Sequence, residues 1–322
     1  MIKKGFSLIE LLVVLVIAGV LVTALYTTYI NLYSGTKQLS KISESNIENI
    51  ISSEIVRVDL SNAGFGLARD EETAAGDTLY PVDWDNGTLD IFTTYDRLEP
   101  RTHGWVLLKC EEEGTDCEID NDSDRREANH FSGLKVIDTG TNRIIDHDIN
   151  SVSTLDFRYA VGYPYDAASA EKFRTITYRM AEDCNDDGTP DRSARCNPNT
   201  AVLCRGTVPV VDCVGGWAVY AGYDDGGDIV YDTLANVIAD SPDNLFSLRR
   251  LVVYVLVQEG QFDSKFNFGD DEMVKNLDFD AEDNALDQLS FPIPANGRNY
   301  RWNIMTIDTK TYNIGDKYEA QQ

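Results

Sequence analysis

The chain begins with a long apolar segment bounded by charged residues. Between Glu10 and Lys37 lie 26 uncharged positions, and Leu, Val and Ile dominate the first half of them. A membrane-spanning helix needs roughly 20 such residues. We therefore expect a transmembrane helix over about residues 6–30. Because Lys3 and Lys4 form a short basic flank, the N-terminus is expected in the cytoplasm and the rest of the chain beyond the membrane.

Helical periodicity continues after the expected span. Apolar residues recur there at spacings of three and four, with glutamates on other faces: Ile47, Ile50, Ile51, Ile55 and Val58. This period is typical of an amphipathic helix that covers a core with its apolar face. Two glycines, at positions 64 and 66, interrupt the pattern. One helix is thus expected over residues 6–63, with a bend near Gly35.

Strand patterns follow the helix. Residues 154–163, 173–180 and 299–310 alternate apolar and polar side chains, as half-buried strands do. Residues 248–260 form a continuous apolar run rich in Val and Tyr, which is typical of a strand buried on both faces. The fold class expected from this order is α+β, with a long N-terminal helix packed on an antiparallel β-sheet.

The part of the chain after the helix, residues 64–322, is large enough to bury a core of its own. We expect it to be an exported, β-rich globular head. Two of its segments, about residues 100–150 and 181–230, are rich in Asp, Gly and Cys. These segments are expected to be insertions closed by disulfides.

Charge is divided unevenly between the helix and the head. Residues 1–63 contain five basic and five acidic groups, so the whole net charge of −26 belongs to the head. Such an acidic surface argues against binding of nucleic acid or anionic lipid through a basic face. It favours solubility, cation binding or a basic partner.

Six cysteines follow one another in three close pairs along the head: Cys110 and Cys117, Cys184 and Cys196, and Cys204 and Cys213. In an exported domain they indicate disulfides, and we expect bonds between these sequence neighbours, although six cysteines allow about 15 connectivities. Zinc is the alternative, but the chain has no C-x-x-C pair, and its three histidines stand at no ligand-like spacing. The absence of C-x-x-C-H also removes covalent haem.

The segment "DCNDDGTPDRSARC" has the spacing of a calcium loop. Alternate oxygen-bearing residues, a glycine and a further acid reproduce most of the first nine positions of an EF-hand loop: Asp183, Asn185, Asp187, Thr189 and Asp191. Position twelve departs from the pattern, because Ala194 replaces the bidentate glutamate. Calcium is therefore the candidate cofactor. The alternative is an acidic surface turn, since Asp, Asn and Gly favour turns by themselves.

Two other acidic segments are weaker candidates. Asp120, Asp122 and Asp124 alternate in the same way, but an arginine occupies the glycine position. The segment "YDDGGD" at residues 223–228 is expected to form a hairpin turn.

No catalytic motif stands out in the sequence. The chain has no G-x-S-x-G, no H-E-x-x-H and no phosphate-binding loop, and histidine is scarce. Carboxylates are so abundant that their proximity in sequence means little. We do not expect an enzyme.

The N-terminal segment "KKGFSLIELLVVLVI" resembles the class III signal of type IV prepilins and pseudopilins. The resemblance implies a cytoplasmic leader over residues 1–5, a cut by prepilin peptidase between Gly5 and Phe6, and N-methylation of Phe6. Glu10 becomes the fifth mature residue, and in this family such a carboxylate pairs with the N-terminal amine of a subunit in the growing filament. A pair of this kind offsets the desolvation cost of a charge in an apolar setting. A cleaved secretory signal peptide fits less well, because no A-x-A site follows the apolar run.

The segment "DLSNAGFGLARD" and the order of the later strands resemble PilW-like minor pilins. This resemblance implies a pilin-like fold and a role in priming type IV pilus assembly or at the filament tip. The implied partners are the major pilin, other minor pilins, prepilin peptidase and the inner-membrane assembly platform. The implied location is the inner membrane as a single-pass protein with its head in the periplasm, and then the pilus at the cell surface. A minor pseudopilin of a type II secretion tip complex and a tip adhesin remain alternatives.

Overall fold

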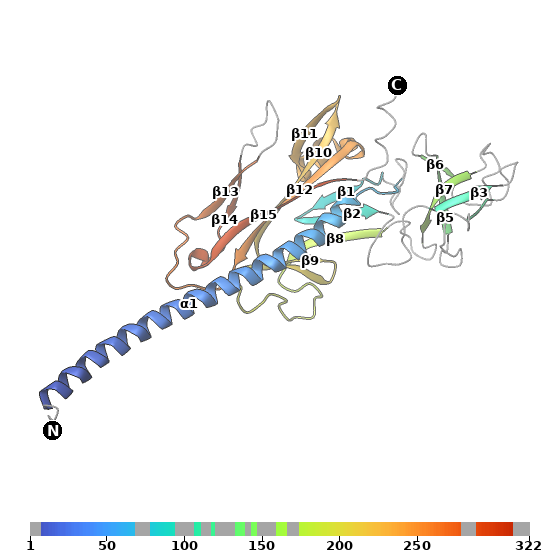
Figure 1. The fold of residues 1–322 in the computed structure, drawn as a ribbon. Coiled ribbons are helices and arrows are strands. Elements are labelled where there is room, and N and C mark those ends of the chain that lie inside the picture. Colours follow the sequence, from blue (N-terminus) through green and yellow to red (C-terminus); the bar gives the residue numbers. More distant parts are fainter. Residues whose placement is uncertain are drawn as a thin grey trace.

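The computed structural model describes residues 8–67, 78–93, 106–110, 117–119, 133–138, 143–146, 159–165, 174–277 and 288–311. Within them a long N-terminal helix runs into a β-rich head, and more than half of the helix projects beyond the head (Figure 1). The fold class is therefore α+β, as the hydrophobic pattern predicts, and it is consistent with a pilin-like fold.

The long helix, α1, spans Leu8–Ser61 without interruption. Its first half is apolar and long enough to cross a membrane. Helical structure continues through Gly35, where the sequence predicts a bend. The helix ends close to the predicted boundary, and Gly64 follows with a φ of +73°, where glycine is favoured.

Eight strands form the main sheet, and they pair in the order β1-β2-β8-β9-β10-β12-β15, with β11 added to β10. Their bounds are β1 (Val82–Asp85), β2 (Thr88–Thr93), β8 (Arg174–Ala181), β9 (Ala201–Arg205), β10 (Val208–Asp225), β11 (Asp228–Thr233), β12 (Leu248–Glu259) and β15 (Arg301–Lys310). Every pairing in it is antiparallel. This confirms the predicted sheet.

Two smaller sheets complete the described strands. One pairs β13 (Glu272–Asn276) with β14 (Gln288–Pro292), and the other has the order β4-β3-β7-β5-β6. The bounds of the second are β3 (Val106–Cys110), β4 (Cys117–Ile119), β5 (Gly133–Asp138), β6 (Arg143–Asp146) and β7 (Tyr159–Tyr165). A short helix and two 3-10 turns link other strands: α2 (Leu234–Asp240), η3 (Pro242–Ser247) and η4 (Gly297–Asn299).

Strand β12 lies at the centre of the core and is buried on both faces, as its continuous apolar run predicts. Val253 and Val255 belong to a cluster that α1, α2 and η3 cover. Tyr254 and Leu256 point into a second cluster on the opposite face, which the β13–β14 hairpin covers through Phe291. Burying each such side chain contributes about 1.5–3 kcal/mol. The head is therefore layered, with helix on one face of the sheet and a small hairpin on the other.

The alternating strands are confirmed where the structure describes them. Ile176 and Tyr178 of β8 are buried, and so are Trp302, Ile304 and Ile307 of β15. Part of the second expected insertion belongs to the main sheet, because residues 201–225 contain β9 and all of β10. Its apolar side chains pack in the core, so the loop that remains outside the sheet is residues 182–200.

Candidate functional site

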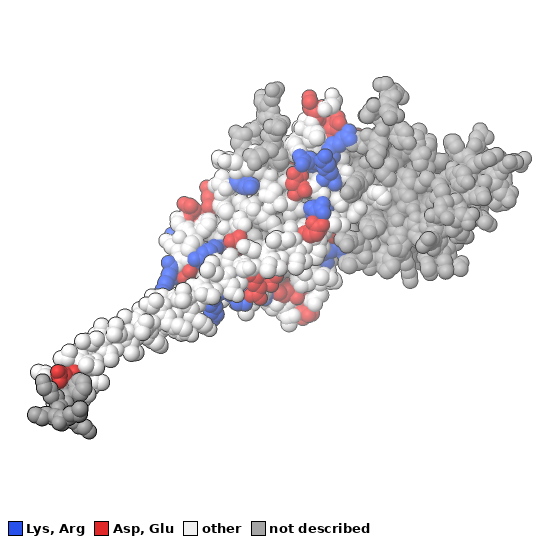
Figure 2. All heavy atoms as spheres, in the orientation of Figure 1, with Lys and Arg blue, Asp and Glu red and all other residues white. Residues whose placement is uncertain are grey.

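The projecting half of α1 is the largest exposed apolar surface in the described part of the chain. Its most hydropathic window is 0% buried. Glu10 lies in the first turn. Beyond that turn the projecting half carries no charged side chain until Lys37, and Figure 2 shows it as an uncharged rod. A surface of this length and composition needs a cover of lipid or of other apolar helices.

Four hydroxyl groups on this half are satisfied within the helix. The hydroxyls of four threonines donate to the carbonyl oxygen four residues earlier, at 2.8 to 2.9 Å: Thr23, Thr27, Thr28 and Thr36. In hydrocarbon an unsatisfied hydroxyl is costly, so this internal bonding suits a helix in a membrane or a filament core.

Three tyrosines form an exposed aromatic group near the end of the apolar half. Tyr26, Tyr29 and Tyr33 are all more than 60% exposed, and the rings of Tyr29 and Tyr33 stack with centroids 6.2 Å apart. Tyrosine is enriched at membrane–water interfaces. Such a group is typical of the level at which a helix leaves a bilayer.

The side of α1 that packs on the head differs from the predicted one. Ile47, Ile50, Ile51 and Ile55 are 57%, 68%, 59% and 42% exposed, so the prediction that they cover the core is wrong for these four residues. Val58, the fifth residue of the predicted face, is half-buried. We call the four exposed isoleucines the isoleucine stripe. At about 100° per residue the stripe lies roughly opposite the buried residues of the same helix. It therefore points away from the head.

The head-facing side of α1 is less apolar than the stripe. Val56 and Leu60 join the core, while Ser45 and Ser52 are buried on the same side of the helix. Each serine bonds to the head: Ser52 Oγ donates to Val210 O at 2.5 Å, and Ser45 Oγ accepts from Gly260 N at 3.2 Å. The physical reason for the reversed face is that these polar contacts match specific groups of the head, so they fix the helix rotation.

A buried ionic network completes this attachment. Asp59 is 4% exposed, and its Oδ2 accepts hydrogen bonds from Tyr178 Oη at 2.6 Å and from Arg205 Nε at 2.5 Å. Burial raises the pKa of the Tyr178 hydroxyl above its usual range, and the negative charge of Asp59 raises it further. The network joins α1 to β8 and β9. Sequence patterns do not predict it, and its one signal is an aspartate between the apolar residues Val58 and Leu60.

The loop of residues 182–200 also clamps the helix. Arg195 forms an ion pair with Glu48 of α1, and its backbone oxygen accepts from Gln258 Nε2 at 3.0 Å. Gln258 is buried, and its Oε1 accepts from Asn197 N at 2.7 Å. Gln258 thus holds the loop against the end of β12, and Arg195 joins the loop to the helix.

Two disulfides in the described residues correct the expected pairing. Cys184 bonds to Cys204, with Cα atoms 5.6 Å apart, and Cys196 bonds to Cys213, with Cα atoms 5.1 Å apart. The predicted bonds Cys184–Cys196 and Cys204–Cys213 are wrong. The reason is strand order: Cys184 follows β8 and β8 pairs with β9, which carries Cys204. Cys196 reaches instead to β10.

The first cysteine pair can be judged from the backbone alone. The register of β3 and β4 sets Cys110 opposite Cys117. Their side chains lie outside the described part of the structure, so their disulfide stays a prediction.

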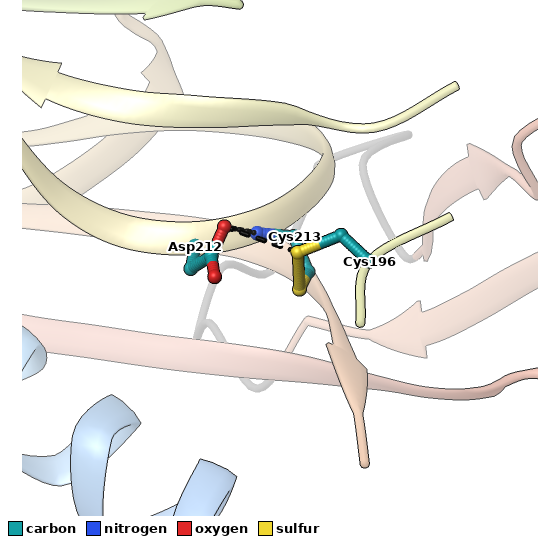
Figure 3. Close-up of side chains that lie close together, drawn as sticks. All are labelled: Cys196, Asp212 and Cys213. Atoms are coloured by element: carbon teal, nitrogen blue, oxygen red, sulfur yellow. Dashed lines mark hydrogen bonds between the residues drawn. A yellow bond between two sulfur atoms is a disulfide. The ribbon is translucent and has the colours of Figure 1, made fainter. Parts of the chain in front are cut away.

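One group of potential metal ligands converges within 4.8 Å in the described residues: Cys196, Asp212 and Cys213 (Figure 3). Both sulfurs belong to the disulfide, so neither is a thiolate. The carboxylate of Asp212 accepts from Cys213 N at 2.8 Å and from Ser193 N at 3.2 Å. Asp212 therefore braces the disulfide loop, and the cluster does not fit a metal.

The candidate calcium loop is held by hydrogen bonds of its own. Asp183 accepts from Gly188 N at 2.6 Å, Asp187 accepts from Thr189 N at 2.8 Å, and Asp191 accepts from Cys184 N at 2.7 Å. The Thr189 bonds lower the pKa of Asp187, which keeps that carboxylate ionised. The three carboxylates do not gather within 4.8 Å of one another as Cys196, Asp212 and Cys213 do. A cation would have to draw them together.

The remaining predicted residues divide into two groups. Gly5 and Phe6 lie outside the described residues, as does the weaker acidic segment at residues 120–124. The expected hairpin turn is present, because Asp225 pairs with Asp228 across Gly226 and Gly227, whose φ values are +68° and +104°. Such positive values favour glycine at both central positions.

Comparison with known proteins agrees with the projecting helix. Residues 1–26 match the family model described as the prokaryotic N-terminal methylation motif. The chain carries a type IV prepilin-like N-terminus. No curated protein and no solved structure matches the chain. The N-terminus thus marks a type IV pilin-like or pseudopilin protein, and its apolar helix is consistent with membrane anchoring and display on a pilus.

Proposed function

We propose that the chain is a PilW-like minor pilin of a type IV pilus, which acts in priming of assembly or at the filament tip. The observation that carries this proposal is the direction of the isoleucine stripe. It continues the exposed apolar surface of the first half of α1 and points away from the head. One side of the helix is therefore open to other subunits over nearly its whole length.

Processing would create the assembly-competent form. On the resemblance described above, prepilin peptidase cuts between Gly5 and Phe6 and methylates the new N-terminus. Glu10 then pairs with the N-terminal amine of a neighbouring subunit and sets the axial register. In a low-dielectric filament core that pairing compensates the cost of removing both charges from water.

The attachment of α1 to the head directs this surface. Asp59, Ser52 and Ser45 hold one side of the helix against the head at three points over about four turns. A rotation of the helix would break these bonds, so the stripe keeps one direction relative to the head. In the proposed filament the head would stay outside while the stripe packs against neighbouring α1 helices.

Size supports a place at the filament end. The head has its own core and two further small sheets, so it is difficult to accommodate repeatedly along a shaft. The partners in this proposal are the major pilin, other minor pilins and the inner-membrane assembly platform. A minor pseudopilin of a type II secretion system would use the same helix chemistry, and it is the main alternative.

A strain that lacks the gene separates these functions. We would measure the major pilin sheared from the cell surface and the secreted enzyme activity of the same culture. Loss of surface pilin with normal secretion supports the minor-pilin function. Normal pili with blocked secretion would indicate that the chain belongs to the secretion pseudopilus. Normal values of both would contradict either assembly function and favour an adhesive head.

For the loop of residues 183–191 we propose calcium as the ligand. The proposal rests on the spacing of its oxygens. Asp183, Asp187 and Asp191 would supply carboxylate ligands, and Thr189 its backbone carbonyl. Bound calcium would neutralise carboxylates that otherwise repel one another and would rigidify the loop that clamps α1.

A further inference from the structure

The segment between β12 and β13, residues 260–271, is the part of the head that reaches farthest along α1 toward its N-terminus (Figure 1). We call it the proximal segment. It is fixed to the helix at Gly260, whose N–H bonds to Ser45 and whose φ is +75°. A Cβ on Gly260 would lie 3.1 Å from Ile42 Cγ1, so the backbone and the helix are in close contact there.

The tyrosine group places the proximal segment close to a membrane surface. Tyr33 is nine residues before Ile42 along the helix. At 1.5 Å per residue, this separation is about 14 Å along the axis. The headgroup region adds several ångströms to the hydrocarbon boundary at which tyrosines lie. Exposed side chains on the proximal segment are therefore within reach of lipid headgroups.

The proximal segment carries an exposed aromatic side chain at this level. Phe262 is 53% exposed, and its ring stands edge-on to Tyr300 with centroids 5.6 Å apart. Lys265 is exposed three residues later, and Lys37 is exposed on α1 five residues before Ile42. An exposed aromatic ring and lysines at this end of the molecule suit the boundary between water and phospholipid.

Arginines outside the proximal segment offset part of its negative charge. The segment itself has three carboxylates and one cation: Asp263, Asp270, Asp271 and Lys265. Arg301 bonds to Asp263 at 3.2 Å, and Arg298 forms an ion pair with Asp271. The chain as a whole has a net charge of −26. An anionic bilayer repels such a head, and the two ion pairs weaken that repulsion at this end.

We propose that the proximal segment rests on the phospholipid headgroups of the membrane that anchors α1, with Phe262 inserted among them. The proposal rests on the membrane-anchored state of the proposed function. This contact holds the head upright on its helix while the subunit waits for assembly. It breaks when the helix is extracted into a filament.

Photocrosslinking tests the contact on the full-length chain in vesicles of phosphatidylethanolamine and phosphatidylglycerol. The photoreactive p-benzoylphenylalanine replaces Phe262 in one variant, Tyr29 in a second and Ile229 in a third. Tyr29 reports insertion of the helix. Ile229 is 42% exposed beside the β10–β11 turn and is the matched control, because that hairpin lies at the other end of the head.

We expect lipid adducts in the variants at Tyr29 and Phe262 and no lipid adduct in the variant at Ile229. Two outcomes overturn the contact but leave the membrane anchor intact. In both, Tyr29 forms a lipid adduct, while Phe262 forms either no adduct or an adduct with protein. Equal lipid adducts at Phe262 and Ile229 overturn the contact as well, because the head would then touch lipid without a fixed orientation. Absence of a lipid adduct at Tyr29 contradicts the membrane-anchored state, and it contradicts the headgroup contact as well.

Discussion

Arg205 Nε donates a hydrogen bond of 2.5 Å to the Asp59 carboxylate, and the contact joins residues 146 positions apart inside the head. The side chains are 11% and 5% exposed, so this is a buried ion pair. Tyr178 donates to the same carboxylate oxygen. The network therefore ties the end of α1 to the sheet at the point where helix and core meet.

Removal of one partner should destabilise the head strongly. We expect Arg205→Met to lower the free energy of unfolding by about 3–5 kcal/mol, because it leaves the Asp59 charge buried. Thermal unfolding of the full-length chain in detergent measures the loss. Glu54→Gln is the matched control, since its pair with Arg57 is exposed, and we expect a change below about 0.5 kcal/mol. Equal effects of the two substitutions would contradict the role given to the buried pair.

Ionisation of the buried Tyr178 hydroxyl should lower the stability of the head at high pH. Its folded-state pKa is raised by burial and by Asp59, so the native state holds the proton after an unfolded tyrosine has lost it. Stability from this group is complete below about pH 10 and falls as the pH rises above that value. Urea unfolding between neutral and strongly alkaline pH measures the slope. Tyr178→Phe should make the slope shallower, and an unchanged slope would show that other groups cause it.

The disulfide assignment is open to direct mapping. Digestion without reduction should release one peptide pair that links Cys184 to Cys204 and another that links Cys196 to Cys213. The double substitution of Cys184 and Cys204 by serine should cost about 2–4 kcal/mol, because the bond closes a loop of 20 residues. Recovery of a Cys184–Cys196 peptide would overturn the pairing.

Calcium should stabilise the head if the loop at residues 183–191 binds it. At a concentration 100 times the dissociation constant, the expected gain is about 2.7 kcal/mol. The change of the melting temperature with calcium measures this gain, with magnesium as the ion control. Asp187→Asn should abolish the shift. An equal shift in that variant, or none in the wild type, would contradict a calcium site in this loop.

Local patterns account for much of the fold. The length of α1, the alternation of β8 and β15 and the double burial of β12 follow from the period of apolar residues, and each is confirmed. The β10–β11 turn follows from its paired glycines. These features depend on residues close in sequence, so the local pattern of apolar and polar residues is enough to predict them.

The orientation of the helix and the disulfides depend instead on distant partners. Ser52 bonds to a carbonyl 158 positions away and Ser45 to an amide 215 positions away, and neither partner can be inferred from the helix alone. The periodicity therefore predicts that the most apolar face packs on the core, although polar contacts turn that face outward. The same reason explains the wrong cysteine pairs, since strand order decides which sulfurs meet.

The isoleucine stripe offers the most direct test of the assembly claim. The measurement is the amount of epitope-tagged protein in filaments sheared from cells, for the wild type and for the double variant Ile50→Asn, Ile51→Asn. Both residues are more than half exposed, so the melting temperature should hardly change. Ile229→Asn on β11 is the control for a polar change at an exposed isoleucine. We predict loss of the double variant from the filaments with the control retained, and wild-type amounts of the folded double variant would contradict incorporation through this face of α1.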